Sequence, residues 1–139
     1  MVHDIGKLGL PVEIINKPNT LNDDELVIIR RHPELGYSLL MQMMRVKSVI
    51  AKVALQHHER LDGSGYPFGL SGDGIVPIAK IIAIADVVDT IVSPQVYKPA
   101  LGLHEAVQEI KHNSGLLYDP EVVTASLGVI EKNNFSFNL

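Results

Sequence analysis

Apolar residues recur every three or four positions along most of the chain, which is the spacing of an amphipathic helix. No stretch alternates convincingly between apolar and polar residues, as a half-buried strand would. The pattern predicts an all-α fold with helices at 22–32, 33–44, 46–58, 78–92, 103–113 and 120–132. Around them we expect a short helical end and a loop at 3–20, and a glycine-rich loop at 60–76.

The most apolar of these helices, 78–92, is hydrophobic on nearly all sides and is therefore expected at the centre of the domain. Asp86 and Asp89 lie within it, three residues apart and on neighbouring parts of one face. A buried carboxylate needs an ion-pair partner, a proton or a metal ion. The alternative is that both carboxylates face solvent and meet Lys80 or Lys98.

Two adjacent histidines, His57 and His58, stand where the predicted helix 46–58 gives way to the glycine-rich loop. Neutral imidazole is the commonest metal ligand near physiological pH. Consecutive side chains on a helix diverge by about 100°. The two side chains are therefore better suited to binding two metal ions, or one metal ion and one outer contact, than to binding a single metal ion together. A surface histidine pair before an ordinary Gly-Pro turn is the alternative.

A second imidazole and carboxylate pair, His3 and Asp4, opens the chain. The two oxygens of Asp4 can bridge two cations, and Lys7 reaches over the same site if the helix continues. A lysine there would neutralise charge on a phosphate. A helix-end pair with a solvated lysine is the alternative. His32 lies on the inner face of its helix, as a ligand or as a hydrogen-bonded core residue.

Composition limits the chemistry that these residues can perform. The 139 residues carry a net charge of −4 and are enough for a single domain, 1–139. A negative net charge does not favour binding to duplex nucleic acid, and the sequence has no apolar stretch long enough to predict a membrane helix. We therefore expect a cytoplasmic protein. Cysteine is absent, so a metal site must use histidine and carboxylate, which suits Fe, Mn, Zn or Ni. Because the pair at 3–4 comes so early, we expect a segment of a longer protein.

Several sequence motifs occur together, in one order, over nearly the whole chain. They are H-D-I-G-K at 3–7, L-P at 10–11, H-P-E-L-G-Y at 32–37, H-H-E-R-L-D-G-S-G-Y-P at 57–67, A-D-V-V-D at 85–89, Y-K-P-A at 97–100 and G-L-L-Y-D-P-E-V-V at 115–123. This set resembles the HD-GYP family of the HD phosphohydrolase superfamily. The resemblance implies an all-α HD-domain helical bundle with a glycine-rich G-Y-P loop.

The resemblance also implies a function and a set of site residues. The best-known members of the family hydrolyse the bacterial messenger cyclic di-GMP to pGpG or GMP. They use two or three divalent metal ions, with Fe or Mn expected first and Zn or Ni as alternatives. The implied metal ligands are His3, Asp4, His32, His57, His58 and Asp86, with Asp4 as the bridge. The implied catalytic residues are Asp4 and Lys7, and the implied substrate-binding residues are Lys7, Tyr66, Asp89 and Lys98.

Two departures from the family pattern keep other functions open. Family members usually carry an upstream helix that donates a histidine, and in three-metal members a glutamate, whereas this chain begins after it. Gln95 stands where the family shows an arginine, and a neutral amide cannot form a bidentate phosphate pair. The alternatives are a degenerate domain that binds a nucleotide or partner protein without turnover, and a phosphohydrolase for another nucleotide. The expected partners are a cyclic dinucleotide, a signalling protein at the G-Y-P loop and a second copy in a homodimer.

Overall fold

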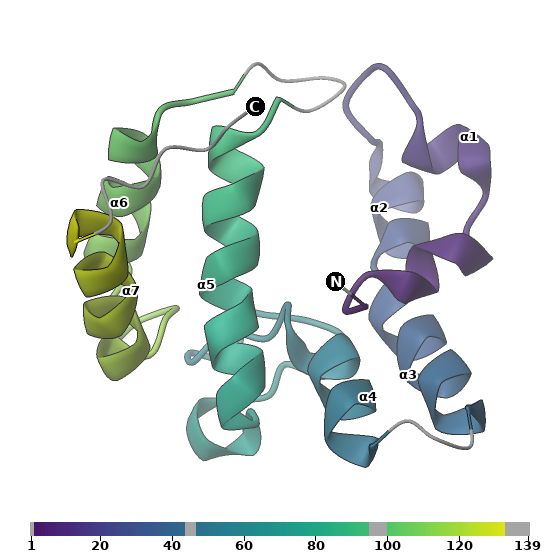
Figure 1. Cartoon of the computed structure of the whole chain (residues 1–139). Coiled ribbons are helices and arrows are strands. Elements are labelled where there is room, and N and C mark those ends of the chain that lie inside the picture. The colour runs from purple at the N-terminus through teal and green to yellow at the C-terminus, as the bar shows by residue number, and fades with distance from the viewer. Residues whose placement is uncertain (1, 44–46, 95–99, 133–139) are drawn as a thin grey trace.

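The computed structural model describes residues 2–43, 47–94 and 100–132, and this part of the chain is helical and contains no strand (Figure 1). The all-α prediction is confirmed. The elements are η1 (Ile5–Gly9), α1 (Val12–Ile15), α2 (Asp23–Ile29), α3 (His32–Gln42), α4 (Ser48–Gln56), η2 (Gly72–Gly74), α5 (Pro77–Val92), α6 (Leu103–His112) and α7 (Pro120–Lys132). None of these helices combines the length and apolarity that crossing a membrane requires.

The start of α2 follows directly from its sequence. The side chain of Asn22 accepts a hydrogen bond from the Glu25 amide at 2.9 Å, and the Glu25 carboxylate accepts one from the Asn22 amide at 2.9 Å. This capping box satisfies amides that a helix start leaves without partners. α2 ends at Ile29, and His32 begins α3 instead of ending the preceding helix. Proline is tolerated in a first helical turn, so Pro33 does not delay α3.

Two other boundaries differ from the expectation. Residues 12–15 form the short helix α1 where a loop was expected. α4 ends at Gln56, so His57 and His58 follow its last turn. The later helices lie within a residue or so of the ranges predicted from periodicity.

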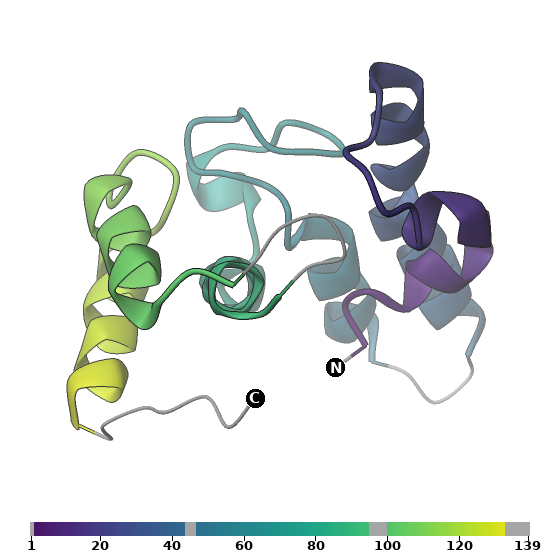
Figure 2. The ribbon, with the colours of Figure 1, turned by 90° about the horizontal axis from the view of Figure 1, so that it is seen from above.

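α5 lies between two groups of helices (Figures 1 and 2). On one side it packs with α6 and α7 around a core of Ile84, Val88, Val92, Ala106, Ile110, Tyr118 and Val123. On the other side lies a smaller core of Leu40, Ala51 and Ala54, against which Ile5 and Tyr37 pack. The predicted central place of α5 is therefore confirmed. Its burial is incomplete, since Ile78 and Ile81 expose 48% and 51% of their surface.

η1 crosses α3 at very close range. A Cβ atom added to Gly6 would overlap the carbonyl oxygen of His32 and lie 2.5 Å from the amide nitrogen of Gly36. Only glycine at position 6 permits this crossing. The crossing places the segment that carries His3 and Asp4 beside the first turn of α3.

Candidate metal centre

Four imidazoles and two carboxylates meet where η1, α3, α4 and α5 come together. His3 and Asp4 come from the segment before η1, and His32 is the first residue of α3. His57 and His58 follow α4, and Asp86 lies in the middle of α5. The structure thus brings together all six residues predicted as ligands, although they are spread over more than eighty positions.

Their donor atoms form two groups, each with atoms within 4.8 Å of one another. The first group contains Asp4, His32, His57 and His58, and the second contains His3, Asp4 and Asp86. Asp4 belongs to both groups. A carboxylate in this place can offer one oxygen to each of two cations.

Two of the imidazoles are held in a defined orientation by backbone carbonyls. His32 Nδ1 lies 2.7 Å from the Ile29 carbonyl oxygen, and His57 Nδ1 lies 2.9 Å from that of Ala54. A carbonyl only accepts hydrogen bonds, so each Nδ1 carries the hydrogen. In a neutral ring, Nε2 then holds a lone pair. Such outer contacts fix the tautomer of a metal-binding histidine.

Three acceptor atoms consequently face one another. Nε2 of His32 lies 3.4 Å from Nε2 of His57, and these atoms lie 3.3 and 3.6 Å from Asp4 Oδ1. His57 is fully buried and His32 is 2% exposed. Lone pairs gathered in a buried place repel one another unless a cation or proton is shared between them.

Two buried polar atoms of the cluster lack a hydrogen-bond partner in the described part of the chain. Asp4 Oδ1 and His3 Nδ1 are buried and have no hydrogen-bond partner among the described residues. An unpartnered buried acceptor costs roughly 1–3 kcal/mol. A first-row divalent ion accepts nitrogen and oxygen donors of this kind. The donor set therefore fits a metal ion.

The second group is wider than the first. His3 Nε2 lies 3.6 Å from both Asp4 Oδ2 and Asp86 Oδ1, and His58 Nδ1 lies 4.0 Å from Asp86 Oδ2. His58 thus belongs to the first group and borders the second. The rings of His57 and His58 are 4.1 Å apart at their centroids. The spacing of side chains within a helix does not apply to them, because both follow the end of α4.

The surroundings set the charge of the carboxylates. Burial raises the pKa of Asp4, but hydrogen bonds from His32 and His57, in the form in which a proton is shared between these groups, and the ammonium of Lys7 lower it well below its usual range. Lys7 Nζ lies 2.7 Å from Asp4 Oδ2. Asp86 is also partly buried, which raises its pKa, yet hydrogen bonding to His3 and its histidine neighbours give a net lowering. Both carboxylates are therefore ionised at neutral pH.

His58 is held neutral. Burial, together with the neighbouring rings of His57 and His32, lowers the pKa of His58 to about 2. Metal ligands must be deprotonated before they bind. The cluster therefore has ionised carboxylates and an uncharged His58, which is the form that a cation would bind.

Tyr66 stands beside the cluster. Its ring stacks on that of His58, with centroids 4.6 Å apart and 22° between the ring planes. Burial raises the pKa of the Tyr66 hydroxyl, so it stays protonated. The Tyr66–Pro67 peptide bond is cis. The loop therefore places one aromatic ring against a candidate metal ligand.

A buried glutamate holds this loop, and the sequence analysis did not single it out. Glu59 is 2% exposed, and its two carboxylate oxygens accept hydrogen bonds from the amides of Phe68 and Leu70, at 2.9 Å each. Gln56 acts similarly further along, where its Oε1 accepts from the Val76 amide at 2.8 Å. The only sequence signal for Glu59 was its place directly after the two histidines.

The other residues considered in the sequence lie away from the cluster or outside the described residues. Asp89 is exposed, accepts a hydrogen bond from Ser93 Oγ at 3.2 Å, and does not join the cluster. Lys80 pairs with Asp119 at 3.1 Å and not with Asp86, so that alternative is wrong for the lysine described. Lys98 and Gln95 lie outside the described residues.

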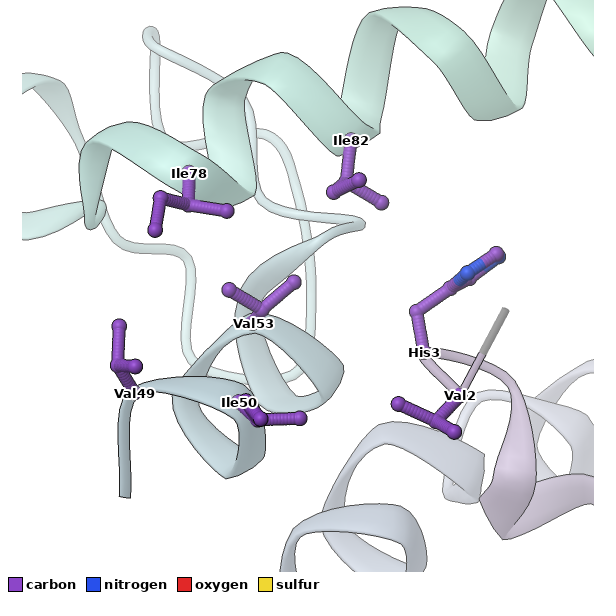
Figure 3. A pocket seen from close by; sticks show the side chains of 7 residues that line it. All are labelled: Val2, His3, Val49, Ile50, Val53, Ile78 and Ile82. Atoms are coloured by element: carbon purple, nitrogen blue, oxygen red, sulfur yellow. The ribbon is translucent and has the colours of Figure 1, made fainter. Parts of the chain in front are cut away.

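An apolar cavity of about 150 Å³ lies beside the cluster (Figure 3). It is lined by Val2, His3, Val49, Ile50, Val53, Ile78 and Ile82. Of the six clustered residues only His3 borders it. The cavity is therefore an apolar neighbour of the candidate metal centre and is separate from its polar donors.

Known proteins resemble this chain in sequence and in fold. The HD domain family matches residues 1–122. The chain is 43% identical, over 91% of its length, to the cyclic di-GMP phosphodiesterase response regulator RpfG of Xanthomonas campestris, of which it covers 34%. It is 45% identical, over 81% of its length, to 3'3'-cGAMP-specific phosphodiesterase 1 of Vibrio cholerae, of which it covers 26%.

Among solved structures, an HDG"Y"P protein from Bdellovibrio bacteriovorus superposes with a TM-score of 0.71. The two sequences are 17% identical, and the match covers 93% of this chain and 40% of that one. This likeness shows the fold. The chain spans 24% to 34% of the length of the curated relatives it matches.

Proposed function

This chain belongs to the HD domain family, as the resemblance of its motifs to HD-GYP proteins predicted, and we propose that it is a metal-dependent phosphodiesterase. Its substrate is cyclic di-GMP, which it hydrolyses to pGpG or GMP in bacterial signalling. The observation that carries the proposal is the meeting of Asp4 Oδ1 with the Nε2 atoms of His32 and His57, three atoms that need a shared cation or proton and whose geometry suits a cation. Relatives named as cyclic di-GMP phosphodiesterases support the choice of substrate.

The two groups of donors support two metal ions that share Asp4. His32, His57 and His58 would hold one ion, and His3 and Asp86 the other. Fe or Mn suits this set of histidines and carboxylates, with Zn or Ni as alternatives. When bound, such ions supply a nucleophilic hydroxide at neutral pH and stabilise charge on phosphoryl oxygens.

The chain's own residues bind and orient the substrate. Lys7 already reaches the edge of the cluster at Asp4 Oδ2, so its ammonium can contact a phosphate that lies over the donors. Tyr66, stacked on His58, presents a ring face and a protonated hydroxyl to a nucleotide at that edge. In hydrolysis the oxygen of water forms a new bond to phosphorus, the P–O bond to one ribose oxygen breaks, and that leaving oxygen takes up the proton released by the water.

The G-Y-P loop supports a further part of the proposal, namely a signalling protein partner. Phe68 in this loop exposes 59% of its surface, although its backbone amide is held by the buried carboxylate of Glu59. Aromatic side chains are enriched at protein interfaces, so Phe68 is the residue of this loop that we propose for such a contact. A homodimer and a cytoplasmic location complete the proposal.

A second substrate has specific support. Three relatives between 34% and 45% identical to this chain are named as 3'3'-cGAMP-specific phosphodiesterases. Cyclic di-GMP and 3'3'-cGAMP share the two phosphodiesters that the cluster and Lys7 would contact. Competition between the two nucleotides in a cleavage assay separates these candidates.

The proposal is tested by metal content and turnover of the full chain. Replacement of the shared ligand, Asp4→Ala, is expected to remove bound metal and to reduce turnover by on the order of a hundredfold or more. Asp73→Ala, in the exposed turn η2, is the matched control and is expected to change neither quantity. Unaltered cleavage by Asp4→Ala would contradict the proposal. Metal binding without cleavage by the unsubstituted chain would favour the non-catalytic alternative.

A further inference from the structure

Arg30 lies next to the candidate metal centre without belonging to it. It is the residue after α2, and the carbonyl of its neighbour Ile29 holds His32 Nδ1 at 2.7 Å. The guanidinium carbon of Arg30 lies 5.3 Å from the centroid of the Tyr66 ring. Tyr66 in turn stacks on His58. A line of contacts therefore runs from Arg30 through Tyr66 to a candidate metal ligand.

The charge of Arg30 has no counterpart in the part of the chain that the structure describes. No carboxylate there lies within ion-pair distance of Arg30, whereas Lys7, Lys17 and Lys80 each have one. Arg30 is also exposed. Its contact with Tyr66 is a cation–π interaction, which uses the charge and leaves the N–H donors of the guanidinium available. An exposed cation with available donors is suited to an anionic ligand.

The substrate class of the proposed function provides such an anion. A cyclic dinucleotide has two phosphodiesters, each with one negative charge. If one is cleaved at the metal centre beside Lys7, the other stays ionised and lies away from the donors. A guanidinium matches phosphate oxygens in a bidentate geometry that a lysine cannot offer.

We propose that Arg30, supported by Tyr66, binds the phosphate that is not being cleaved and so makes the site specific for cyclic dinucleotides. This inference rests on the proposed function and names the residue that selects its substrate class. It assigns Arg30 to substrate binding and not to the chemical step. The expected signature is therefore a change in KM with kcat preserved.

Two substrates distinguish binding of the second phosphate from a general effect on the cleavage of any phosphodiester. Cyclic di-GMP has two phosphodiesters, and bis(p-nitrophenyl) phosphate has one. Arg30→Ala is expected to raise KM for cyclic di-GMP by roughly 10- to 100-fold, the range for a lost hydrogen bond to a charged group, with kcat within about twofold. Neither constant should change for bis(p-nitrophenyl) phosphate. Arg30→Lys, which keeps the charge without the planar fork, should fall between.

Arg31→Ala is the matched control, because Arg31 is also an exposed arginine and the structure gives no contact between it and Tyr66. It should leave both substrates unaffected. An Arg30→Ala variant with unchanged KM for cyclic di-GMP, or with an equal rise for the single diester, would overturn the inference.

Equilibrium binding separates this inference from the proposed function. The probe is a phosphorothioate analogue of cyclic di-GMP that resists cleavage, titrated into the full chain. The same 10- to 100-fold weakening is expected for Arg30→Ala. A chain that binds the analogue through Arg30 but cleaves neither substrate would contradict the phosphodiesterase and retain the binding role. Equal affinity of the analogue for the variant and the unsubstituted chain would contradict the binding role alone.

Discussion

His32 and His57 each donate Nδ1–H to a carbonyl three residues earlier in the chain and direct Nε2 at Asp4. The carbonyls belong to Ile29, the last residue of α2, and to Ala54 in the last turn of α4. The last carbonyls of a helix have no partner within it. A histidine just after a helix therefore satisfies a carbonyl and has its tautomer fixed in one contact. This local arrangement orients both rings before any metal binds.

At the same scale, Gly65 is required by close packing. A Cβ atom there would overlap the Glu59 Cα atom and lie 2.5 Å from the Arg60 nitrogen and the His58 oxygen. We expect Gly65→Ala to destabilise the protein by roughly 1–3 kcal/mol or more, because backbone has to move. Urea unfolding measures the change.

Gly128→Ala, within α7, is its control. A Cβ atom at Gly128 meets nothing within 4 Å. Alanine is favoured over glycine inside a helix, so this variant should gain about 0.5–1 kcal/mol. Equal effects of the two substitutions would show that glycine is not needed for packing at position 65.

At the scale of elements, the G-Y-P loop is held to the end of α4 by two buried side chains. Glu59 accepts hydrogen bonds from two loop amides, and Gln56 accepts one just before α5. These contacts fix the loop between α4 and α5, and with it the ring of Tyr66. The loop is thus positioned by residues adjacent to the histidines, so the ligands and the substrate-facing ring are coupled.

Glu59→Gln tests this coupling. The glutamine side chain keeps one acceptor oxygen, but its NH₂ group would face the second backbone N–H, so that two donors meet. We therefore expect the free energy of unfolding to fall by about 1–3 kcal/mol. Hydrogen exchange at the amides of Phe68 and Leu70 should accelerate. Asp62→Asn, an exposed acid of the same loop that accepts from the Ser64 amide, is the control with a smaller effect. Unchanged exchange in Glu59→Gln would disprove the coupling.

The turn between α6 and α7 gives a prediction for pH. Burial and the nearby Glu109 raise the pKa of Tyr118 to about 12, and its hydroxyl donates to Glu109 Oε1 at 3.0 Å. An unfolded tyrosine ionises near pH 10. The stabilisation by the protonated hydroxyl is therefore complete below pH 10 and is lost as the pH rises to about 12.

Tyr118→Phe removes this contribution. At pH 7 the variant should be less stable by about 1 kcal/mol, the value of one hydrogen bond. The difference from the unsubstituted chain should shrink between pH 10 and about 12. Thermal unfolding across this range measures it, and a difference that stayed constant with pH would refute the assignment.

At the scale of the molecule, the candidate metal centre joins segments that are otherwise far apart in the chain. Its donors come from the segment before η1, from α3, from the end of α4 and from α5. The two hydrophobic cores lie on either side of α5. A bound metal ion would therefore connect α5 to the helices that form the smaller core, α3 and α4. A cation bound only by the folded chain stabilises all of these segments at once.

Metal removal is therefore expected to lower the melting temperature. At a free metal concentration a hundredfold above Kd, binding contributes about 2.7 kcal/mol, or a shift of roughly 5–10 °C for a chain of this size. Calorimetry with Mn²⁺ and then with a chelator measures the shift. Asp4→Ala should show none. A chelator-independent Tm of the unsubstituted chain would show that the centre binds no metal.

The sequence alone determined the longer helices, though not α1 or the ends of α2 and α4, because helical periodicity and caps are local properties. Asn22 and Glu25 define the start of α2, and Pro77 defines that of α5, whatever the rest of the chain does. The motifs also identified the six residues that meet. Residue type and spacing were sufficient there, since the motifs carry the chemistry of the ligands.

Only the tertiary structure decided how these residues are used. Asp86 and Asp89 share a helix and a motif, but packing turns Asp86 into the cluster and leaves Asp89 in solvent. The roles of Asp4 in both donor groups, of Glu59 in the loop and of Arg30 on Tyr66 arise between segments many residues apart. A local pattern cannot specify such contacts, because they depend on which faces of the helices pack together.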